Sequence, residues 1–230
     1  MKTVGLLVAT YCRARQLEEL LASCREYVDD AVVAHDGPEE EGWSSYLVAT
    51  QYDCYYTETR QHYGYCEPIR RLALAHLATD WVFIVDDDER PNEALLKDLH
   101  RLISTNINAY NVPMQQWLNG QLALNYYHRR LIRNWNELQS PLLLHVQMGG
   151  YLAPEADLDP AVYWMKHIQD GVGVEERKAR YTQVCLDHAQ RYGDIPGVPE
   201  HLLRCVADYP GATAAVRQAL LEGRNGHRNS

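Results

Sequence analysis

The sequence lacks several features by which common protein classes are identified. Only 1 of its 230 residues is phenylalanine, and none of its 6 cysteines belongs to a C-x-x-C pair. Zinc ribbons and redox motifs need that spacing, because one short turn must direct two thiolates to a single atom or to each other. We therefore predict reduced, structural cysteines scattered through the fold.

No apolar run reaches the ~20 residues that a membrane-spanning helix needs. The longest runs, Val4–Ala9 and Trp81–Val85, have the length of strands. The first residues carry one lysine and lead directly into an apolar run without a small-residue cleavage site, so we expect no signal peptide. The formal net charge of −9 and the pI of about 5.5 argue against a general nucleic-acid binder. These absences predict a soluble, acidic, cytoplasmic protein.

Glycine-rich phosphate-binding loops are also missing. The P-loop pattern G-x-x-x-x-G-K does not occur, and the dinucleotide pattern G-x-G-x-x-G is absent, since the glycines of Gly171–Gly173 follow no predicted strand. The turn Thr10–Arg15, after the first apolar run, contains no glycine. This argues against a sugar nucleotidyltransferase, which needs a glycine-rich loop there.

The first 105 residues alternate between apolar strands and amphipathic helices. The predicted elements are strands over Val4–Thr10, Ala31–Ala34 and Trp81–Val85, and helices over 17–28, from Glu67 and from Asn92. This order is typical of an α/β fold with right-handed crossovers between parallel strands. Between residues 39 and 64 the pattern is weak, and only a short strand near Tyr46–Ala49 is expected.

Beyond residue 105 the pattern changes. Short strands are predicted over Ala109–Gln115, His128–Arg133 and Leu142–Val146, a loop over Tyr151–Asp159, and helices over 174–192, 201–207 and 212–221. Pro113 lacks an N–H and indicates an edge strand or a bulge. We predict an α/β domain over residues 1–173 and a helical extension over residues 174–230. The apolar stripes of that extension are a candidate interface for a homo-oligomer.

Three consecutive carboxylates, Asp86, Asp87 and Asp88, follow the strand Trp81–Val85. Ligands of open α/β sheets bind at this end of the strands. Alternation sends Asp86 and Asp88 to one side, where they repel each other unless a cation lies between them. A hard ion such as Mg²⁺ or Mn²⁺ takes few carboxylates and fills its shell with water and phosphate oxygens. We predict a metal and phosphate site, the alternative being an acidic loop at a helix N-terminus.

Four stretches resemble, in order and spacing, the family 2 glycosyltransferases of the GT-A fold. They are Val4–Tyr11 with its following helix, Ala31–Gly37, Tyr63–Asp88 and Tyr110–His145. The third ends in the D-x-D motif of the family, so Asp86 and Asp88 are the matching pair. The resemblance covers about residues 3–150. It implies a GT-A-like mixed sheet and the transfer of a sugar from a nucleotide-sugar donor to an acceptor hydroxyl. It also implies a divalent metal (Mn²⁺ or Mg²⁺) and inversion at the anomeric carbon.

The resemblance further implies the residues that bind the donor. Asp36 matches the aspartate that contacts the nucleobase, and His145 matches a histidine near the diphosphate. The expected metal ligands are Asp86, Asp88 and His145. The other residues expected to contact the donor are Thr10, Tyr11, Arg13, Arg70, Asp87, Arg129 and Arg133.

One departure from the family pattern concerns the general base. An inverting transfer needs a group that takes the proton of the acceptor hydroxyl. Relatives often carry a glutamate just after the histidine, but His145 is followed by a valine and a glutamine. The remaining candidates are His145 itself, Glu137, Glu155 and Asp157. A non-catalytic nucleotide- or sugar-binding protein that retains the GT-A fold is the alternative function, and the acceptor (glycan, lipid, protein or modified nucleic-acid base) stays open.

Overall fold

The computed structural model describes most of the chain. The described residues are 1–37, 39–59, 62–63, 66–118, 120–134, 154–168, 174–192, 198–207 and 210–226. They form two compact units: the first holds the described residues up to Ile168, and the second holds the three helices that follow. The predicted strand Leu142–Val146 and the candidate residues Glu137 and His145 lie outside the described residues.

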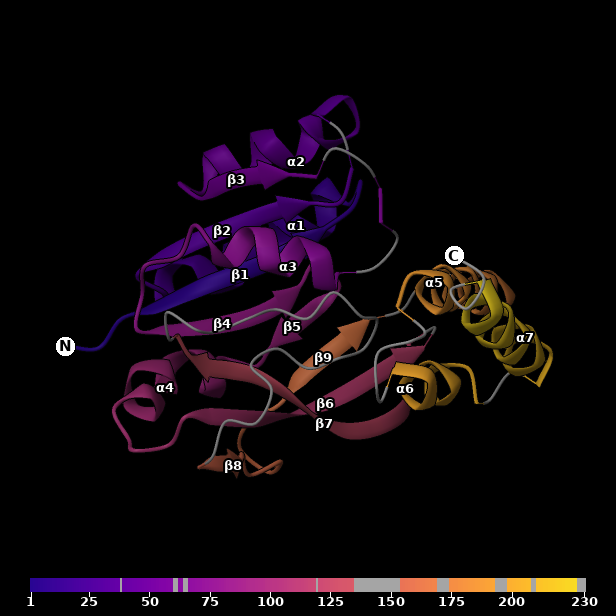
Figure 1. The fold of residues 1–230 in the computed structure, drawn as a ribbon. Coiled ribbons are helices and arrows are strands. Elements are labelled where there is room, and N and C mark those ends of the chain that lie inside the picture. Colours follow the sequence, from indigo (N-terminus) through magenta and orange to yellow (C-terminus); the bar gives the residue numbers. More distant parts are fainter. Residues whose placement is uncertain are drawn as a thin grey trace. The chain divides into compact units, whose positions relative to one another are not determined.

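A nine-stranded mixed sheet forms the centre of the first unit (Figure 1), counted over the described residues. Its strands are β1 (Val4–Thr10), β2 (Asp30–His35), β3 (Tyr55–Glu58), β4 (Trp81–Asp86), β5 (Glu89–Pro91), β6 (Ala109–Leu118), β7 (Gln121–Arg133), β8 (Glu155–Asp157) and β9 (Met165–Ile168). Their order is β3-β2-β1-β4-β7-β6-β9-β5, with β8 paired to β6. β3, β2, β1 and β4 run parallel, and β7 runs antiparallel to β4. The predicted mixed α/β class is therefore confirmed.

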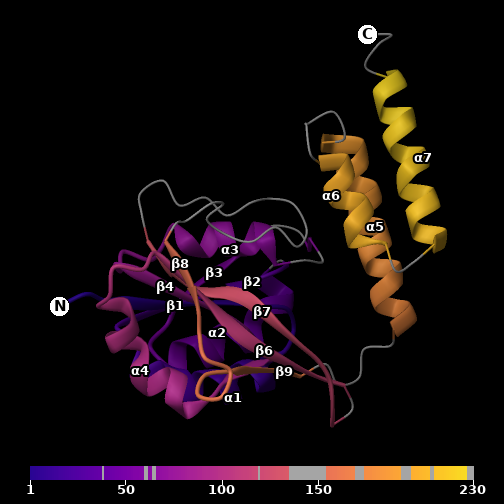
Figure 2. The same cartoon turned by 90° about the horizontal axis from the view of Figure 1, so that it is seen from below.

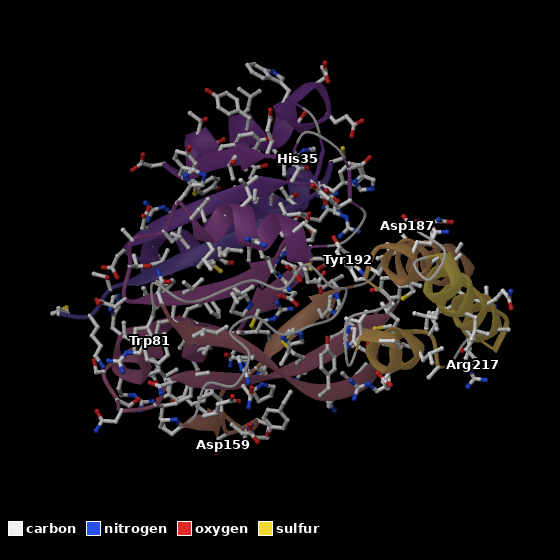
Figure 3. The ribbon with its side chains drawn as sticks, viewed as in Figure 1. His35, Trp81, Asp159, Asp187, Tyr192 and Arg217 are labelled. Carbon is white, nitrogen blue, oxygen red and sulfur yellow. The ribbon has the colours of Figure 1, made fainter. Side chains whose placement is uncertain are left out.

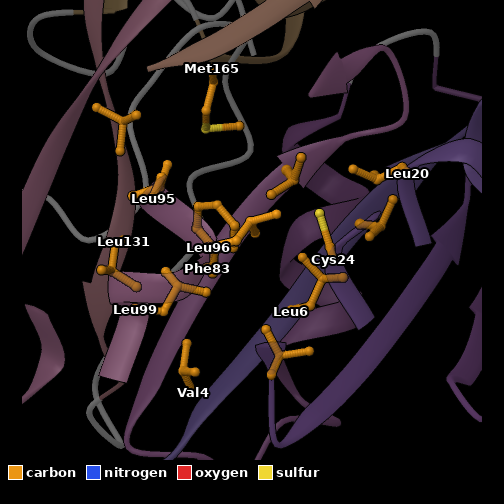
Figure 4. Packing of buried hydrophobic residues seen from close by; sticks show 14 of the residues in the cluster. Val4, Leu6, Leu20, Cys24, Phe83, Leu95, Leu96, Leu99, Leu131 and Met165 are labelled. Atoms are coloured by element: carbon orange, nitrogen blue, oxygen red, sulfur yellow. The ribbon is translucent and has the colours of Figure 1, made fainter. Parts of the chain in front are cut away.

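Helices cover both faces of the parallel half of this sheet (Figure 2). They are α1 (Ala14–Cys24), continued by a 3-10 turn over Arg25–Tyr27, α2 (Glu39–Gln51), α3 (Glu67–Leu74) and α4 (Glu93–Ile103). Leu6 of β1 belongs to a core cluster that also includes side chains of α1, α2 and α4, whereas Leu7 belongs to a second cluster with side chains of α3. Figure 4 shows the larger cluster, which includes Leu6, Leu20 and Phe83. β1 and β4 are buried on both faces, which explains their uninterrupted apolar sequences.

The segment after residue 38 corrects the sequence prediction. The strand expected near Tyr46–Ala49 is wrong, because these residues belong to α2, and the strand β3 follows it instead. Trp43 and Leu47 remain 54% and 52% exposed, while Ala49 is fully buried. Large side chains on the outer face of α2 conceal the helical period of its buried face.

β6 accommodates Pro113 because neither of its two partners on that side pairs with it at this residue. β8 pairs with β6 only over Ala109–Asn111, and β9 pairs with it from Met114 onward. Pro113, which has no N–H to donate, lies in the gap between these two partners. The loop predicted over Tyr151–Asp159 is corrected for Glu155–Asp157, which form β8. Such a short strand depends on its partner in the sheet rather than on its own sequence.

The second unit consists of α5 (Val174–Tyr192), α6 (Val198–Cys205) and α7 (Pro210–Gly226). The prediction for α5 is confirmed, while α6 and α7 begin earlier than expected, with Pro199 in the first turn of α6 and Pro210 opening α7. Cys185, Leu202 and Val216 are fully buried. No helix in the described part of the chain is long and apolar enough to cross a membrane. None of the six cysteines forms a disulfide in this structure.

Candidate functional site

The carboxyl ends of β1, β2 and β4 are joined by short hydrogen bonds. β1 lies between the other two strands. The backbone N–H of Asp36 donates to the Thr10 carbonyl at 2.9 Å, and the Thr10 hydroxyl donates to Asp87 Oδ2 at 2.7 Å. Thr10 is 3% exposed, so these contacts are protected from water. The predicted base-reading residue and the aspartate triplet therefore lie along one edge of the sheet, as parallel strands require.

Asp86 is held by two arginines from different elements. Arg70 of α3 donates to both of its carboxylate oxygens at 2.6 Å, and Arg130 of β7 approaches Oδ2 at 3.4 Å. Burial by itself raises the pKa of Asp86, but the two guanidinium charges reverse that effect and hold the pKa well below its usual range. Asp86 is therefore a fixed, ionised acceptor.

Glu89 completes this cluster from within the sheet. It is 0% exposed, its Oε2 accepts the backbone N–H of Asp86 at 2.9 Å, and its Oε1 is ion-paired with Arg130. Burial raises the pKa of Glu89 to about 7, against the attraction of Arg130. The prediction that Asp86 and Asp88 repel each other unless a cation lies between them is therefore corrected. For Asp86, arginine side chains supply the positive charge.

Asp87 turns toward the sheet rather than toward a ligand. It is 4% exposed, and it contacts Thr10 and Arg13, whose Nη1 lies 3.1 Å from Oδ1. Burial, followed by the charge of Asp88, raises the pKa of Asp87 to about 7. Asp87 joins β1 to β4, and this geometry does not support its predicted contact with a donor.

Asp88 has a mixed set of neighbours. Its Oδ2 lies 2.9 Å from Arg13 Nη1, and its Oδ1 lies 3.6 Å from Nε2 of His167 on β9. The other ring nitrogen of His167 lies 3.2 Å from the Tyr126 hydroxyl, which orients the ring. Burial raises the pKa of Asp88, but the hydrogen bond and charge of His167 outweigh it and leave the pKa lowered.

A divalent cation fits these residues at Asp88. A carboxylate oxygen and an imidazole nitrogen 3.6 Å apart are close enough to share one ion. No group of three or more histidine, cysteine, aspartate or glutamate side chains in the described ranges is arranged to hold a metal. Phosphate oxygens and water would have to complete the shell, as is usual for Mg²⁺ and Mn²⁺ in phosphate sites. The third predicted ligand, His145, lies outside the described residues.

Asp36 is surrounded by hydrogen-bond donors and aromatic rings. Its carboxylate accepts the Tyr63 backbone N–H at 2.7 Å and lies 2.9 Å from Nδ1 of His62. The His62 ring stacks on Tyr11, with centroids 4.0 Å apart. His35, labelled in Figure 3 at the end of β2, accepts the Cys12 backbone N–H at 3.2 Å. A flat aromatic surface thus lies directly beside a buried carboxylate.

Several predicted site residues lie elsewhere. Arg133 pairs with Trp81 at the amino end of β4, roughly 16 Å along the strand from Asp86. Its predicted role at the donor is therefore wrong, because β7 runs antiparallel and carries Arg133 away from the aspartates. Arg129 is ion-paired with Glu155 of β8. Asp157, also on β8, lies three strands from β4 and accepts a hydrogen bond from Asn111 at 2.8 Å.

Four residues that contact the aspartates were not predicted from the sequence, and all but Glu89 come from distant segments. They are His62, Glu89, Arg130 and His167. For Arg130, the sequence offered one indication. Side chains alternate between the two faces of a strand, so Arg129 and Arg130 must point to opposite faces of the sheet, and only one of them can face Asp86. Nothing in the sequence near His167 indicates its contact with Asp88, because β9 reaches β5 and β6 only through the fold.

Comparison with known proteins gives similarity in structure but not in sequence. No protein-family model matches the chain, and no curated protein matches it in sequence. Residues 1–349 of S. aureus TarS in complex with UDP-GlcNAc match with a TM-score of 0.61 and 16% identity, over 92% of this chain and 72% of that one. A longer S. aureus TarS structure matches with a TM-score of 0.57 and 15% identity, and the match spans only 43% of it.

A third solved structure extends this comparison. The mannosyltransferase PcManGT from Pyrobaculum calidifontis, in complex with GDP-Man and Mn²⁺, matches with a TM-score of 0.52 and 16% identity, over 98% of this chain and 76% of that one. At these identities the likeness concerns the fold. The chain has the GT-A-like fold of these glycosyltransferases, as the sequence resemblance implied.

Proposed function

We propose that this chain is a family 2 glycosyltransferase that transfers a sugar from a nucleotide-sugar donor to an acceptor hydroxyl. The observation that carries the proposal is the edge shared by Asp36 and the pair Asp86 and Asp88. These residues end β2 and β4, two strand spacings apart, which is about 10 Å. That separation suits a nucleoside diphosphate lying across β1, with its base at Asp36 and its diphosphate at Asp88. The complexes of the similar structures with UDP-GlcNAc and GDP-Man support this class of donor.

Different residues of this edge bind the base, the ribose and the diphosphate of the donor. Asp36 accepts an N–H of the base, while Tyr11 and His62 offer an aromatic surface for stacking. Asp86, fixed by Arg70 and Arg130, is an acceptor for a ribose hydroxyl. Arg13 bridges Asp87 and Asp88 and can donate to the diphosphate, because its side chain is one-third exposed.

Asp88 would hold the proposed metal, with His167 beside it as a second ligand. When bound, it neutralises the charge that develops on the leaving diphosphate. The combination of a carboxylate with an imidazole favours Mn²⁺ over Mg²⁺, since Mg²⁺ prefers oxygen ligands. Tyr126 keeps the His167 ring oriented toward Asp88.

The stereochemistry of the transfer and the identity of the general base are proposed from the sequence. We propose inversion, with the general base among His145, Glu137 and Asp157. Of these, Asp157 is described, and its exposed carboxylate is bound to Asn111 on β8. Nuclear magnetic resonance of the product anomer tests inversion: a product with the configuration of the donor would exclude it.

Calorimetry with UDP and GDP, each with and without Mn²⁺, tests the donor site. We expect binding of one nucleotide to strengthen at least about tenfold with Mn²⁺, and Asp88→Asn to abolish that gain. Glu18→Gln, an exposed carboxylate of α1, removes the same charge and serves as the control. Equal gains in wild type and Asp88→Asn would refute the metal site.

Release of UDP or GDP from a panel of nucleotide sugars then separates an enzyme from a binding protein. Turnover that requires Asp88 supports the transferase. Tight binding of a donor without hydrolysis or transfer to any acceptor in a glycan, lipid, protein and DNA panel would favour the non-catalytic alternative.

A further inference from the structure

Two thiols meet inside the second unit. Cys185 of α5 is 0% exposed, while Cys205, the last residue of α6, is partly exposed. A side-chain hydrogen bond joins the two thiols, although the residues lie 20 positions apart. The pair arises because the buried face of α5, which includes Val184 and Ala189, packs against α6. No C-x-x-C spacing indicates it in the sequence.

A histidine accompanies the more exposed thiol. His201 lies one turn before Cys205 on α6, and its Nε2 is 3.5 Å from the Cys205 sulfur. An imidazole at this distance can accept the thiol proton and leave a thiolate, which is the reactive form of cysteine. Cys185 has the opposite character: its hydrogen bond to Cys205, together with burial, raises the pKa of its thiol far above the ordinary value.

We propose that Cys205 and Cys185 form a reversible dithiol–disulfide pair that reacts with small-molecule disulfides of the glutathione type. Cys205 is the attacking thiol because it is the accessible member and has His201 beside it. Cys185 is the resolving thiol because it is buried against Cys205. Exchange rates depend on the thiolate fraction and the accessibility of the attacking thiol, and Cys205 is the member of the pair that offers both.

The reaction balances in two exchange steps. The Cys205 thiolate attacks one sulfur of the oxidised disulfide, so that a mixed disulfide forms and one small thiolate leaves. The Cys185 sulfur, after losing its proton to solvent or to His201, attacks the Cys205 sulfur and displaces the second thiolate. Two protein thiols are oxidised and one external disulfide is reduced to two thiols. The product cross-links α5 to α6.

The other cysteines provide matched controls. Cys12 is exposed, and its sulfur lies 3.8 Å from Nε2 of His35, but no hydrogen bond joins it to another cysteine among the described residues. Cys24 is fully buried in the hydrophobic core, and the Ser23 hydroxyl is the polar partner of its sulfur among the described contacts. Modification of Cys12 therefore shows how readily an exposed cysteine of this protein reacts. Replacement of Cys24 shows how much the loss of a buried thiol destabilises the fold.

The test uses the full-length reduced protein with glutathione disulfide. After acid quenching and alkylation, peptide mass spectrometry should find a disulfide between Cys185 and Cys205 that dithiothreitol reverses. The oxidised protein should also unfold at a higher temperature, since the cross-link restricts the unfolded chain. Cys185→Ser should trap glutathione on Cys205, and Cys205→Ser should leave Cys185 unmodified. His201→Gln should slow the first step at least about tenfold.

The outcomes that overturn the proposal need no variant. If Cys12 takes up glutathione while Cys205 and Cys185 stay reduced in the same wild-type sample, the pair is not a redox site. The same conclusion follows if glutathione stays on Cys205 and Cys185 never displaces it to form the protein disulfide. Should Cys185→Ser fail to fold by circular dichroism while Cys24→Ser folds, Cys185→Ala replaces it, since a small apolar side chain suits that buried position.

Discussion

Nη2 of Arg70 lies 2.6 Å from each carboxylate oxygen of Asp86. Arg70 comes from the helix α3 and Asp86 from the end of β4, so one side chain secures the helix to the candidate site. The guanidinium and carboxylate side chains are only 8% and 22% exposed, which limits screening by water. The pair therefore contributes to the fold and fixes the position of Asp86.

Arg70→Ala should lower the free energy of unfolding by about 3 kcal/mol. The substitution leaves the Asp86 carboxylate charged and removes one of the two guanidinium groups that balance this charge, while Arg130 remains nearby. Arg71→Ala is the control, because Arg71 is exposed on the same helix and its loss should cost no more than about 0.5 kcal/mol. Urea denaturation measures both. Equal costs would show that the Arg70–Asp86 contact contributes nothing measurable to stability.

Asp36→Asn should weaken binding of UDP and GDP about tenfold while leaving pyrophosphate binding unchanged. Uracil and guanine each present a ring N–H that a carboxylate can accept, and the neutral amide accepts it less strongly. CDP is the control ligand, because cytosine has no ring N–H to donate. Calorimetry decides the question, and an equal loss for UDP, CDP and pyrophosphate would remove Asp36 from the base site.

The imidazole of His128 on β7 should make the protein sensitive to acid. Burial, aided by the charges of Arg130 and Arg70, lowers the pKa of His128 to about 3. In the unfolded chain the pKa is about 6.5. As the pH falls from 6.5 toward 3, the unfolded state therefore binds a proton that the folded state does not. The free energy of unfolding should fall by at most about 1.4 kcal/mol per pH unit from this group.

His128→Gln provides the comparison, because glutamine is polar but does not titrate. Denaturation at pH 4, 5, 6 and 7 should give a shallower loss of stability for the variant than for the wild type below about pH 6.5. Above that pH the two slopes should agree. Parallel curves at all four values would show that His128 is protonated equally in both states.

Gly42→Ala should destabilise the protein by about 1 to 3 kcal/mol, although alanine favours helices. A Cβ at this position of α2 would overlap the Tyr56 hydroxyl and approach His35 Nδ1 to 3.0 Å. Gly211→Ala in α7 is the control, since nothing lies within 4 Å of its added Cβ, and it should stabilise by up to about 1 kcal/mol. In a Tyr56→Phe background the cost at Gly42 should shrink. If Gly42→Ala destabilises the Tyr56→Phe protein as much as the wild type, the added Cβ clashes with His35 rather than with Tyr56.

Local sequence patterns were enough to predict three of the four parallel strands, β1, β2 and β4, and the edge at which the aspartates lie, whereas β3 was missed. Uninterrupted apolar runs identify β1 and β4, and the leucines of α4 recur at helical spacing on one buried face. Asp36 and Asp88 then follow on the same edge, because parallel strands bring their carboxyl ends together. These inferences need only local periodicity and the direction of the strands.

The basic side chains at that edge could not be predicted in full from local patterns, because strand pairing and the fold place them there. Arg129 and Arg133 were expected at the site, but Arg130 contacts Asp86, and His167 reaches Asp88 from a strand that the sequence does not indicate. The side to which a strand residue points is set by pairing, and a shift of one residue reverses it. The contact between Cys185 and Cys205 likewise depends on how α5 meets α6. Such contacts join segments far apart in the chain, where local sequence patterns carry no information about distance.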